Sequence, residues 1–102
     1  NSNDFLEIIS KGKKFTNSGL TFYYLKNDID EANFGISIKK KTGNAVYRNK
    51  LKRQIKSLFK LNERQFIGFN VLVINYKKRL KPIDYTELKL VFEKFFKKTK
   101  LF

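Results

Sequence analysis

Residues 35–56, GISIKKKTGNAVYRNKLKRQIK, constrain the fold of this chain more than any other segment. They include eight Lys or Arg residues and no Asp or Glu, so the segment repels itself unless it meets a polyanion. The first residues alternate at period two, which predicts a half-buried strand. After Asn44 the apolar residues follow a helical period. The segment therefore has to bury an apolar stripe and present a basic face.

The helix predicted after Thr42, Gly43 and Asn44 has two distinct sides. Either Asn44 or Thr42 can cap its first turn. At 100° per residue, the apolar side holds Tyr47, Leu51, Ile55, Leu58 and Phe59, and the basic side holds Arg48, Asn49, Lys52, Arg53, Lys56 and Lys60.

The rest of the chain predicts a mixed fold. Phe5, Ile8 and Ile9 share one face of a helix near 3–11, which Gly12 can end as a C′ glycine. The later patterns predict an aromatic strand over 20–25, an acidic connection over 27–33 and an alternating strand over 34–39. After the basic helix they predict a loop over 61–68, a central strand over 69–76 and a basic loop over 77–82. A last helix, capped by Asp84 and Glu87, is expected to end near residue 98. This order indicates an α/β or α+β fold with one sheet covered by helices, and any strand–helix–strand crossover is expected to be right-handed.

Composition is typical of one domain over residues 1–102 that binds a polyanion. The chain has 102 residues, 41% of them hydrophobic, and a net charge of +14. A nucleic acid is the first expectation for the partner, and an anionic membrane surface is the second. No stretch approaches the ~20 apolar residues of a spanning helix, and no signal peptide is visible. Because the chain starts at Asn1 without Met, we expect a trimmed start.

The absence of His and Cys excludes several kinds of chemistry. Thiol catalysis, Cys/His zinc sites and His-based acid–base mechanisms are ruled out. A chain without Cys also suits a reducing cytosol, so we expect a cytoplasmic protein. Since no convincing carboxylate cluster stands in for His, we expect no catalytic residue and no metal site in the protein itself.

The basic helix face is the main candidate for RNA binding. Arg48, Lys52 and Lys56 form one row at i, i+4 and i+8. A solvated surface is the alternative, but such a surface normally mixes charge signs, and no acidic residue occurs between Glu31 and Glu63. Lysines 39–41 precede the helix start, where backbone N–H groups can bind a phosphate. The predicted RNA-binding set is Lys40, Lys41, Asn44, Arg48, Asn49, Lys50, Lys52, Arg53 and Lys56.

Aromatic and acidic residues supply weaker candidates. Phe5, Phe22, Tyr23 or Tyr24 could stack on unpaired bases, although most aromatic residues in such a chain form the core. Phe22 and Tyr23 have to face opposite sides of their strand. The acidic residues Asp28, Asp30 and Glu31 could hold Mg²⁺, but a polar turn explains them better.

The segment GNAVYRNKLKR closely resembles the signature of the bacterial ribonuclease P protein subunit, the basic partner of a catalytic RNA. Family members show the pattern G-x-S-x-x-K-K-x-G-x-A-V-x-R-N-R-x-K-R-x-x-R. The chain matches it at Gly35, Ser37, Lys40, Lys41, Gly43, Ala45, Val46, Arg48, Asn49, Lys52 and Arg53. The resemblance extends over essentially the whole chain, and includes Asp4, Phe5 and Gly12 in the first helix.

This resemblance implies both a fold and a role. It implies a two-layer sandwich in the order α-β-β-β-α-β-α, with a left-handed β-α-β crossover. It also implies removal of the 5′ leader from precursor tRNA, with chemistry done by Mg²⁺ that the RNA subunit holds. The basic helix would bind the catalytic RNA. A cleft lined by Phe5, Tyr23 and Lys39 would take the single-stranded leader.

Three positions depart from the family pattern. Lys50 and Lys56 stand where Arg is usual, which keeps the charge but loses the bidentate fork. Ile9 stands where many relatives carry an aromatic residue. The main alternative function is a non-catalytic structural or ribosomal-type RNA-binding protein, which would not require the signature. A stand-alone nuclease or a membrane-surface protein is a third reading.

Overall fold

The computed structural model describes residues 2–75 and 83–99. The helices are α1 (Ser2–Lys11), α2 (Ala45–Leu61) and α3 (Tyr85–Thr99). The strands are β1 (Lys13–Asn17), β2 (Leu20–Lys26), β3 (Asn33–Ile38) and β4 (Phe69–Asn75). Two short 3₁₀ helices, η1 (Lys40–Thr42) and η2 (Glu63–Phe66), flank α2. The predicted basic loop over 77–82 lies outside the described residues.

The four strands form one sheet in the order β1-β2-β4-β3. β2 pairs antiparallel with both β1 and β4, whereas β3 pairs parallel with β4. A parallel pair needs a crossover, and α2 lies within it. The central position predicted for the strand near 69–76 is confirmed, and so is the strand–helix–strand unit. The left-handed sense of the crossover stays a prediction of the resemblance.

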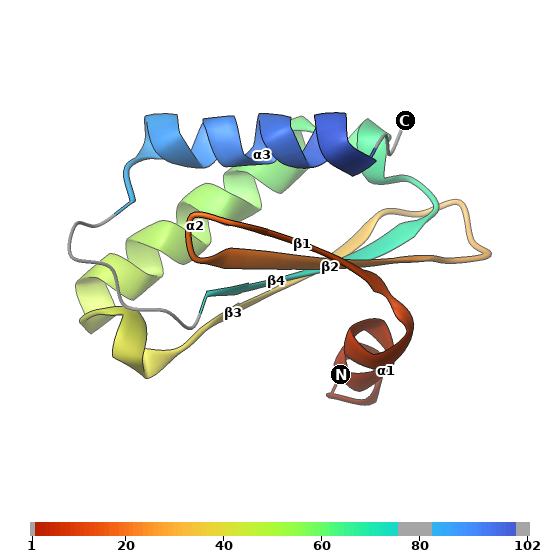
Figure 1. The fold of residues 1–102 in the computed structure, drawn as a ribbon, viewed down its shortest axis with the longest axis horizontal. Helices are drawn as coiled ribbons and strands as arrows, with labels where there is room; N and C mark the ends of the chain where they lie inside the picture. Colours follow the sequence, from red (N-terminus) through yellow and green to blue (C-terminus); the bar gives the residue numbers. More distant parts are fainter. Residues whose placement is uncertain (1, 76–82, 100–102) are drawn as a thin grey trace.

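The helices cover the two faces of the sheet unequally. α2 and α3 lie together over one face, and α1 lies on the other face near one end of the sheet (Figure 1). The predicted mixed α+β fold is therefore confirmed. Its two main layers are the sheet and the α2–α3 pair, and α1 adds a partial cover on the second face.

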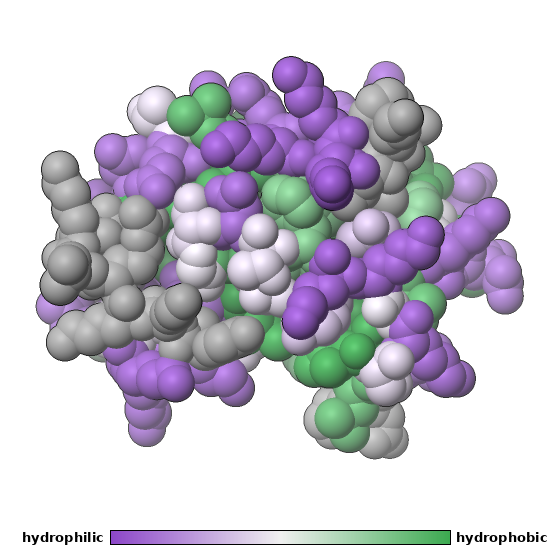
Figure 2. Space-filling model, in the orientation of Figure 1, coloured by the Kyte–Doolittle hydropathy of each residue, from purple (hydrophilic) through white to green (hydrophobic). Residues whose placement is uncertain are grey.

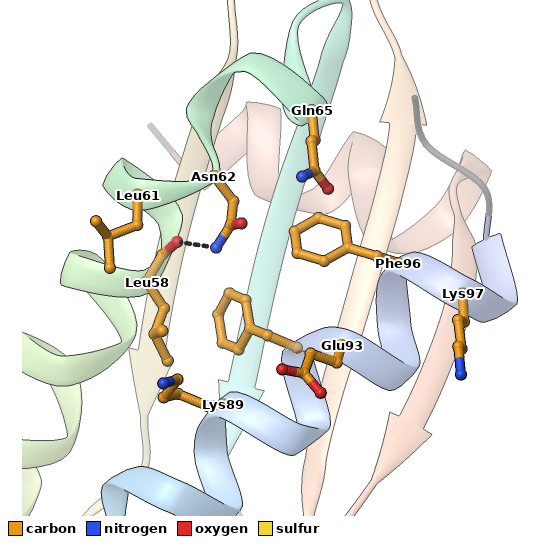
Figure 3. A pocket seen from close by; sticks show the side chains of 9 residues that line it. Leu58, Leu61, Asn62, Gln65, Lys89, Glu93, Phe96 and Lys97 are labelled. Carbon is orange, nitrogen blue, oxygen red and sulfur yellow. Dashed lines mark hydrogen bonds between the residues drawn. The ribbon is translucent and has the colours of Figure 1, made fainter.

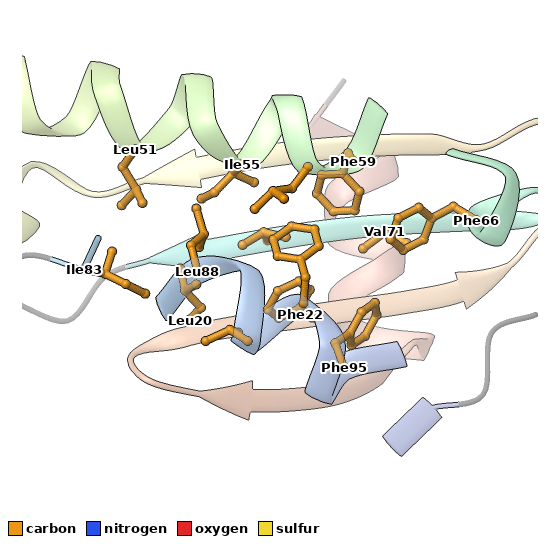
Figure 4. Packing of buried hydrophobic residues seen from close by; sticks show 14 residues of the cluster. Leu20, Phe22, Leu51, Ile55, Phe59, Phe66, Val71, Ile83, Leu88 and Phe95 are labelled. Carbon is orange, nitrogen blue, oxygen red and sulfur yellow. The ribbon is translucent and has the colours of Figure 1, made fainter. Parts of the chain in front are cut away.

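The core fills the space between the sheet and the α2–α3 layer (Figure 4). Alternation along β2 sends Leu20 and Phe22 into it, and neither side chain is exposed to solvent. Phe22 stacks on Phe95 of α3 with ring centroids 4.5 Å apart, and Phe34 of β3 stacks on Phe59 of α2 at 4.7 Å. Each such burial contributes about 1.5–3 kcal/mol, so these rings fix how both helices sit on the sheet.

β1 is the element that the residue patterns missed. Its sequence, KKFTN, offers one large apolar side chain, Phe15, and its two lysines are exposed. β1 is an edge strand, and exposed lysines are a common protection of edges against pairing with another chain. Only the family resemblance implied three strands before α2. The structure also places η2 inside the loop predicted over 61–68.

The predicted helix ends are largely confirmed. Asn44 caps α2, since its Oδ1 accepts the Tyr47 N–H at 2.9 Å. Thr42 does not cap it, because its hydroxyl donates to the Lys39 carbonyl at 2.7 Å. Asp84 Oδ1 accepts the Glu87 N–H at 2.8 Å and so caps α3.

Gly12 follows the last residue of α1, but not for the reason predicted. Among the described residues, positive φ angles at glycine occur at Gly19 and Gly68, not at Gly12. Gly12 is instead required by a close approach. A Cβ there would overlap the Ile8 carbonyl oxygen and lie 2.8 Å from the carbonyl oxygen of Tyr24 in β2. The missing side chain lets α1 turn directly onto the sheet.

Gly12→Ala should therefore destabilise the protein by about 1–3 kcal/mol, because the new methyl group meets backbone oxygens that cannot rotate away. Urea unfolding monitored by circular dichroism measures the change. Ser10→Ala, at an exposed position of the same helix, is the control. A Gly12→Ala free energy of unfolding within about 0.5 kcal/mol of the control would contradict this packing.

Candidate nucleic-acid interface

The start of α2 is held by a network of short contacts. Asn44 supplies the cap, and its carbonyl accepts the Arg48 N–H at 3.0 Å. A Cβ on Gly43 would lie 2.6 Å from Cδ2 of the Tyr47 ring, so this ring packs directly against the turn. The Tyr47 hydroxyl accepts the Ile83 N–H at 3.3 Å. These contacts fix the rotation of α2 and with it the direction of its basic side chains.

The predicted RNA-binding residues lie in η1, at the cap of α2 and along α2, and we call this set the basic face. All of them are exposed except Arg48, which is half-buried. The face is the set Lys40, Lys41, Asn44, Arg48, Asn49, Lys50, Lys52, Arg53 and Lys56. On the opposite side of α2, Leu51, Ile55, Leu58 and Phe59 are buried.

Arg48 differs from the other cations because it is anchored. Its Nε donates to the Gly43 carbonyl at 3.2 Å. This contact takes one of the five N–H donors of the guanidinium and orients the two Nη groups. Arg48 can therefore position a phosphate while it stabilises the turn, whereas the exposed lysines of α2 act as point charges.

Three backbone N–H groups of the segment 39–43 are used within the chain. The N–H groups of Thr42 and Gly43 donate to the carbonyls of Lys39 and Lys40, at 3.1 and 3.4 Å. The Lys39 N–H donates to the Asn75 carbonyl at 2.8 Å. These three donors are therefore not available to a phosphate, and phosphate binding by other N–H groups at the start of α2 stays a prediction.

A cleft separates α1 from the sheet. Its volume is about 360 Å³, and its lining includes Phe5, Ile8, Asn33, Gly35 and Asn70. A Cβ on Gly35 would lie 2.6 Å from the Phe5 ring, so the ring rests on the bare backbone of β3. Phe5 is 38% exposed. An aromatic face thus remains accessible at the edge of the cleft.

Tyr23 and Lys39 share the sheet face with Phe5 but do not line this cleft. Strand register puts Gly35, Leu72 and Tyr23 in one row, so Tyr23 lies about 10 Å from Gly35 across the sheet. Lys39 follows Gly35 by four residues, or about 13 Å along the strand direction. The three predicted residues therefore outline an extended surface and not a single pocket.

Sequence reasoning missed two polar groups on this sheet face. The Asn70 Oδ1 accepts from Asn27 Nδ2 at 2.9 Å and from Asn33 Nδ2 at 3.2 Å. Lys14 of β1 pairs with Tyr23, so the two side chains share this sheet face. No sequence signal marked the asparagines, because their meeting depends on strand register. Lys14 was missed because β1 was missed.

Two further surfaces stand out. A cavity of about 500 Å³ lies between the end of α2 and α3, and Leu58, Asn62, Gln65 and Phe96 project around it (Figure 3). In the space-filling view, hydrophilic residues lie along α3 and hydrophobic residues lie at α1 (Figure 2). Of the α1 side chains, Leu6 is 63% exposed.

The acidic residues that follow β2 lie in an exposed connection. Asp28, Asp30 and Glu31 lie in the connection between β2 and β3, as expected of a turn, and the Ile29 N–H donates to the Asn27 Oδ1 at 3.1 Å. Across residues 2–75 and 83–99, no group of three or more His, Cys, Asp or Glu side chains could hold a metal ion. Within the same ranges, none of the helices has the length and apolar character needed to cross a membrane.

The comparisons with known proteins all indicate the same family. The family model described as Ribonuclease P matches residues 1–100. The ribonuclease P protein component of Staphylococcus epidermidis is 34% identical over 99% of this chain and 88% of its own length. That of Thermotoga maritima is 36% identical over 89% of this chain and 79% of its length. Matches to the Clostridioides difficile and Mesoplasma florum components span 64% and 50% of those relatives.

Solved structures agree with the sequence comparisons. The RNase P protein of Staphylococcus aureus superposes with a TM-score of 0.88 at 33% identity, and the match covers 100% of this chain and 94% of that one. The similarity includes the sheet, the three helices and the segment that carries the basic face. The chain therefore belongs to the family of ribonuclease P protein components.

Proposed function

We propose that this chain is the protein subunit of a cytoplasmic ribonuclease P, which removes the 5′ leader from precursor tRNA. The main support for the proposal is the signature GNAVYRNKLKR, whose cations lie on the outer side of α2 while its Leu51 is buried in the core. In this proposal the whole chain, 1–102, acts as one ribonuclease P protein domain.

The proposed role of the protein is electrostatic and positional. The RNA subunit supplies the Mg²⁺ ions and the catalytic centre, and no step is assigned to a side chain of the protein. A chain of net charge +14 offsets the repulsion between two RNA molecules that have to approach each other. Binding of this kind depends strongly on salt and little on sequence, which suits a subunit that serves many precursor tRNAs.

The leader is proposed to lie across the sheet face that α1 only partly covers. Phe5 and Tyr23 offer rings for stacking, while Lys39 and Lys14 offer charges for the backbone. Stacking is worth ~1–3 kcal/mol per base and tolerates any base. The separation of these residues fits an extended single strand better than a compact ligand.

A non-catalytic structural RNA-binding protein is the second candidate. It shares the charge and the fold class, but its function would not depend on a 5′ leader. Discrimination between precursor and mature tRNA separates the two candidates, because only the precursor carries the leader.

Loss of charge from the basic face should weaken binding to a bacterial ribonuclease P RNA. We choose the double variant Arg53→Ala/Lys56→Ala because both side chains are exposed, whereas Arg48 also stabilises the turn. The slope of log K against log salt should flatten by roughly one to two units, since about two phosphate contacts are lost. Filter binding at several salt concentrations measures the slope.

The matched control removes two charges from another helix. Lys94→Ala/Lys98→Ala changes exposed residues of α3 and lowers the net charge equally. If both double variants flatten the slope to the same extent, binding depends on net charge alone and the basic face has no special role.

Tyr23→Leu should weaken binding of precursor tRNA to the assembled holoenzyme and leave mature tRNA unaffected. Part of the ~1–3 kcal/mol of one base stack should be lost. Tyr24→Leu is the matched control, because Tyr24 is half-buried on the opposite face and its ring lies 5.6 Å from that of Phe95. It should lower the melting temperature without changing the preference for precursor. Equal losses of precursor and mature tRNA affinity in Tyr23→Leu would argue against a leader site here.

The protein without RNA should not process precursor tRNA, because it contains no His, no Cys and no carboxylate cluster in the described residues. A mutant of the Staphylococcus aureus RNase P protein is described by its defective mRNA degradation activity. Because that mutant links the Staphylococcus aureus protein to mRNA degradation, the assay of RNA-free protein uses an mRNA as a second substrate beside precursor tRNA. Correct 5′ maturation by protein that is free of RNA would overturn the assignment of catalysis to the RNA subunit.

A further inference from the structure

A small pocket lies where α2 meets the start of α3. Its volume is about 260 Å³. Tyr47, Lys50 and Gln54 line it from α2, and Asp84 and Tyr85 line it from the other side. The α2 residues recur at i, i+3 and i+7, so they share one flank of the helix. This flank adjoins the basic face, because Lys50 belongs to both.

The floor of the pocket is apolar and its walls are aromatic. Leu51 and Ile83 are buried beneath it. The Tyr47 ring is fixed by the hydrogen bond of its hydroxyl to the Ile83 N–H. Lys89 Nζ lies 5.9 Å from the centroid of the Tyr85 ring, at the outer range of a cation–π contact. The Tyr47 ring is thus pre-oriented, which lowers the entropic cost of binding a flat group.

The polar groups at the pocket favour a neutral ligand with hydrogen-bonding edges. Within residues 2–75 and 83–99, the half-buried amide of Gln54 makes no hydrogen bond, so its donors and its acceptor remain available. Asp84 uses Oδ1 to cap α3 and brings a negative charge to one wall. This charge disfavours a phosphate inside the pocket. Lys50 is exposed and can reach a phosphate outside it.

We propose that this pocket receives one unstacked base of the RNA that lies on the basic face. The base packs against the rings of Tyr47 and Tyr85, its polar edge meets the Gln54 amide, and Lys50 contacts the adjoining phosphate. Aromatic rings combined with an amide are the usual means by which proteins bind unstacked bases. The volume lies below the range of drug-sized ligands, which suits a single heterocycle. The inference rests on the proposed function, since it requires RNA on α2.

The test compares base contacts with phosphate contacts in binding to a bacterial ribonuclease P RNA. Tyr85→Leu keeps an apolar side chain but removes the ring, and should weaken binding about 5- to 150-fold, the equivalent of ~1–3 kcal/mol per stack. Gln54→Ala should weaken binding in the same direction. Neither variant should change the slope of log K against log salt, because no phosphate contact is lost. Lys50→Ala should flatten the slope by roughly one unit.

The controls separate failure of this inference from failure of the proposed function. Leu90→Ala, at an exposed position of α3, controls for general effects on that helix. Melting temperatures identify variants that have lost structure, and Tyr85→Phe should recover most of the affinity that Tyr85→Leu loses. Wild-type affinity in both Tyr85→Leu and Gln54→Ala would overturn the pocket while leaving the proposed function intact. A flattened salt slope in Tyr85→Leu would also overturn it. A wild-type protein that fails to bind the RNA would overturn both proposals.

Discussion

The structure depends on the packing of α2, a helix with one apolar side and one basic side. Leu51, Ile55 and Phe59 of α2 are at most 1% exposed, and Phe59 contacts rings from both the sheet and α3. Because those contacts fix the rotation of α2, its cations have to point outward. The free energy gained by burying the apolar side exceeds the mutual repulsion of these cations, so the folded state tolerates that repulsion. The same packing that makes the core therefore creates the basic face.

The sheet separates core from ligand surface by alternation. In β2, Phe22 is fully buried while its neighbour Tyr23 lies on the opposite, partly open face. Glycines then adjust how closely α1 approaches that face. Gly12 lets the end of α1 lie directly against Tyr24 of β2, and Gly35 accepts the Phe5 ring on its backbone. These two glycines thus leave the Phe5 ring accessible beside the sheet.

Much of this arrangement could be predicted from local patterns. The cap at Asn44, the two-sided helix after it, the central strand β4 and the helix capped by Asp84 all follow from spacing and residue type. What could not be predicted depends on tertiary contacts. β1 carries too few apolar residues to signal a strand, although pairing with β2 stabilises it.

The site residues likewise divide into those that local patterns predict and those that depend on tertiary contacts. Exposure of the lysines on α2 follows from the helical wheel, but the anchoring of Arg48 on Gly43 depends on the turn before the helix. Phe5, Tyr23 and Lys39 share a sheet face, yet register spreads them over an extended surface. The pocket at Gln54 and Tyr85 exists only because α2 and α3 meet there, and nothing in either segment alone indicates it.

The most direct test of the central claim is the Mg²⁺ dependence of 5′ processing by a bacterial ribonuclease P RNA, measured with and without this protein. If the protein acts by neutralising phosphates, it should lower the Mg²⁺ concentration that gives half-maximal cleavage of precursor tRNA. The effect should diminish as monovalent salt rises, because salt screens the same charges. An identical Mg²⁺ profile with and without a folded, RNA-bound protein would contradict the account.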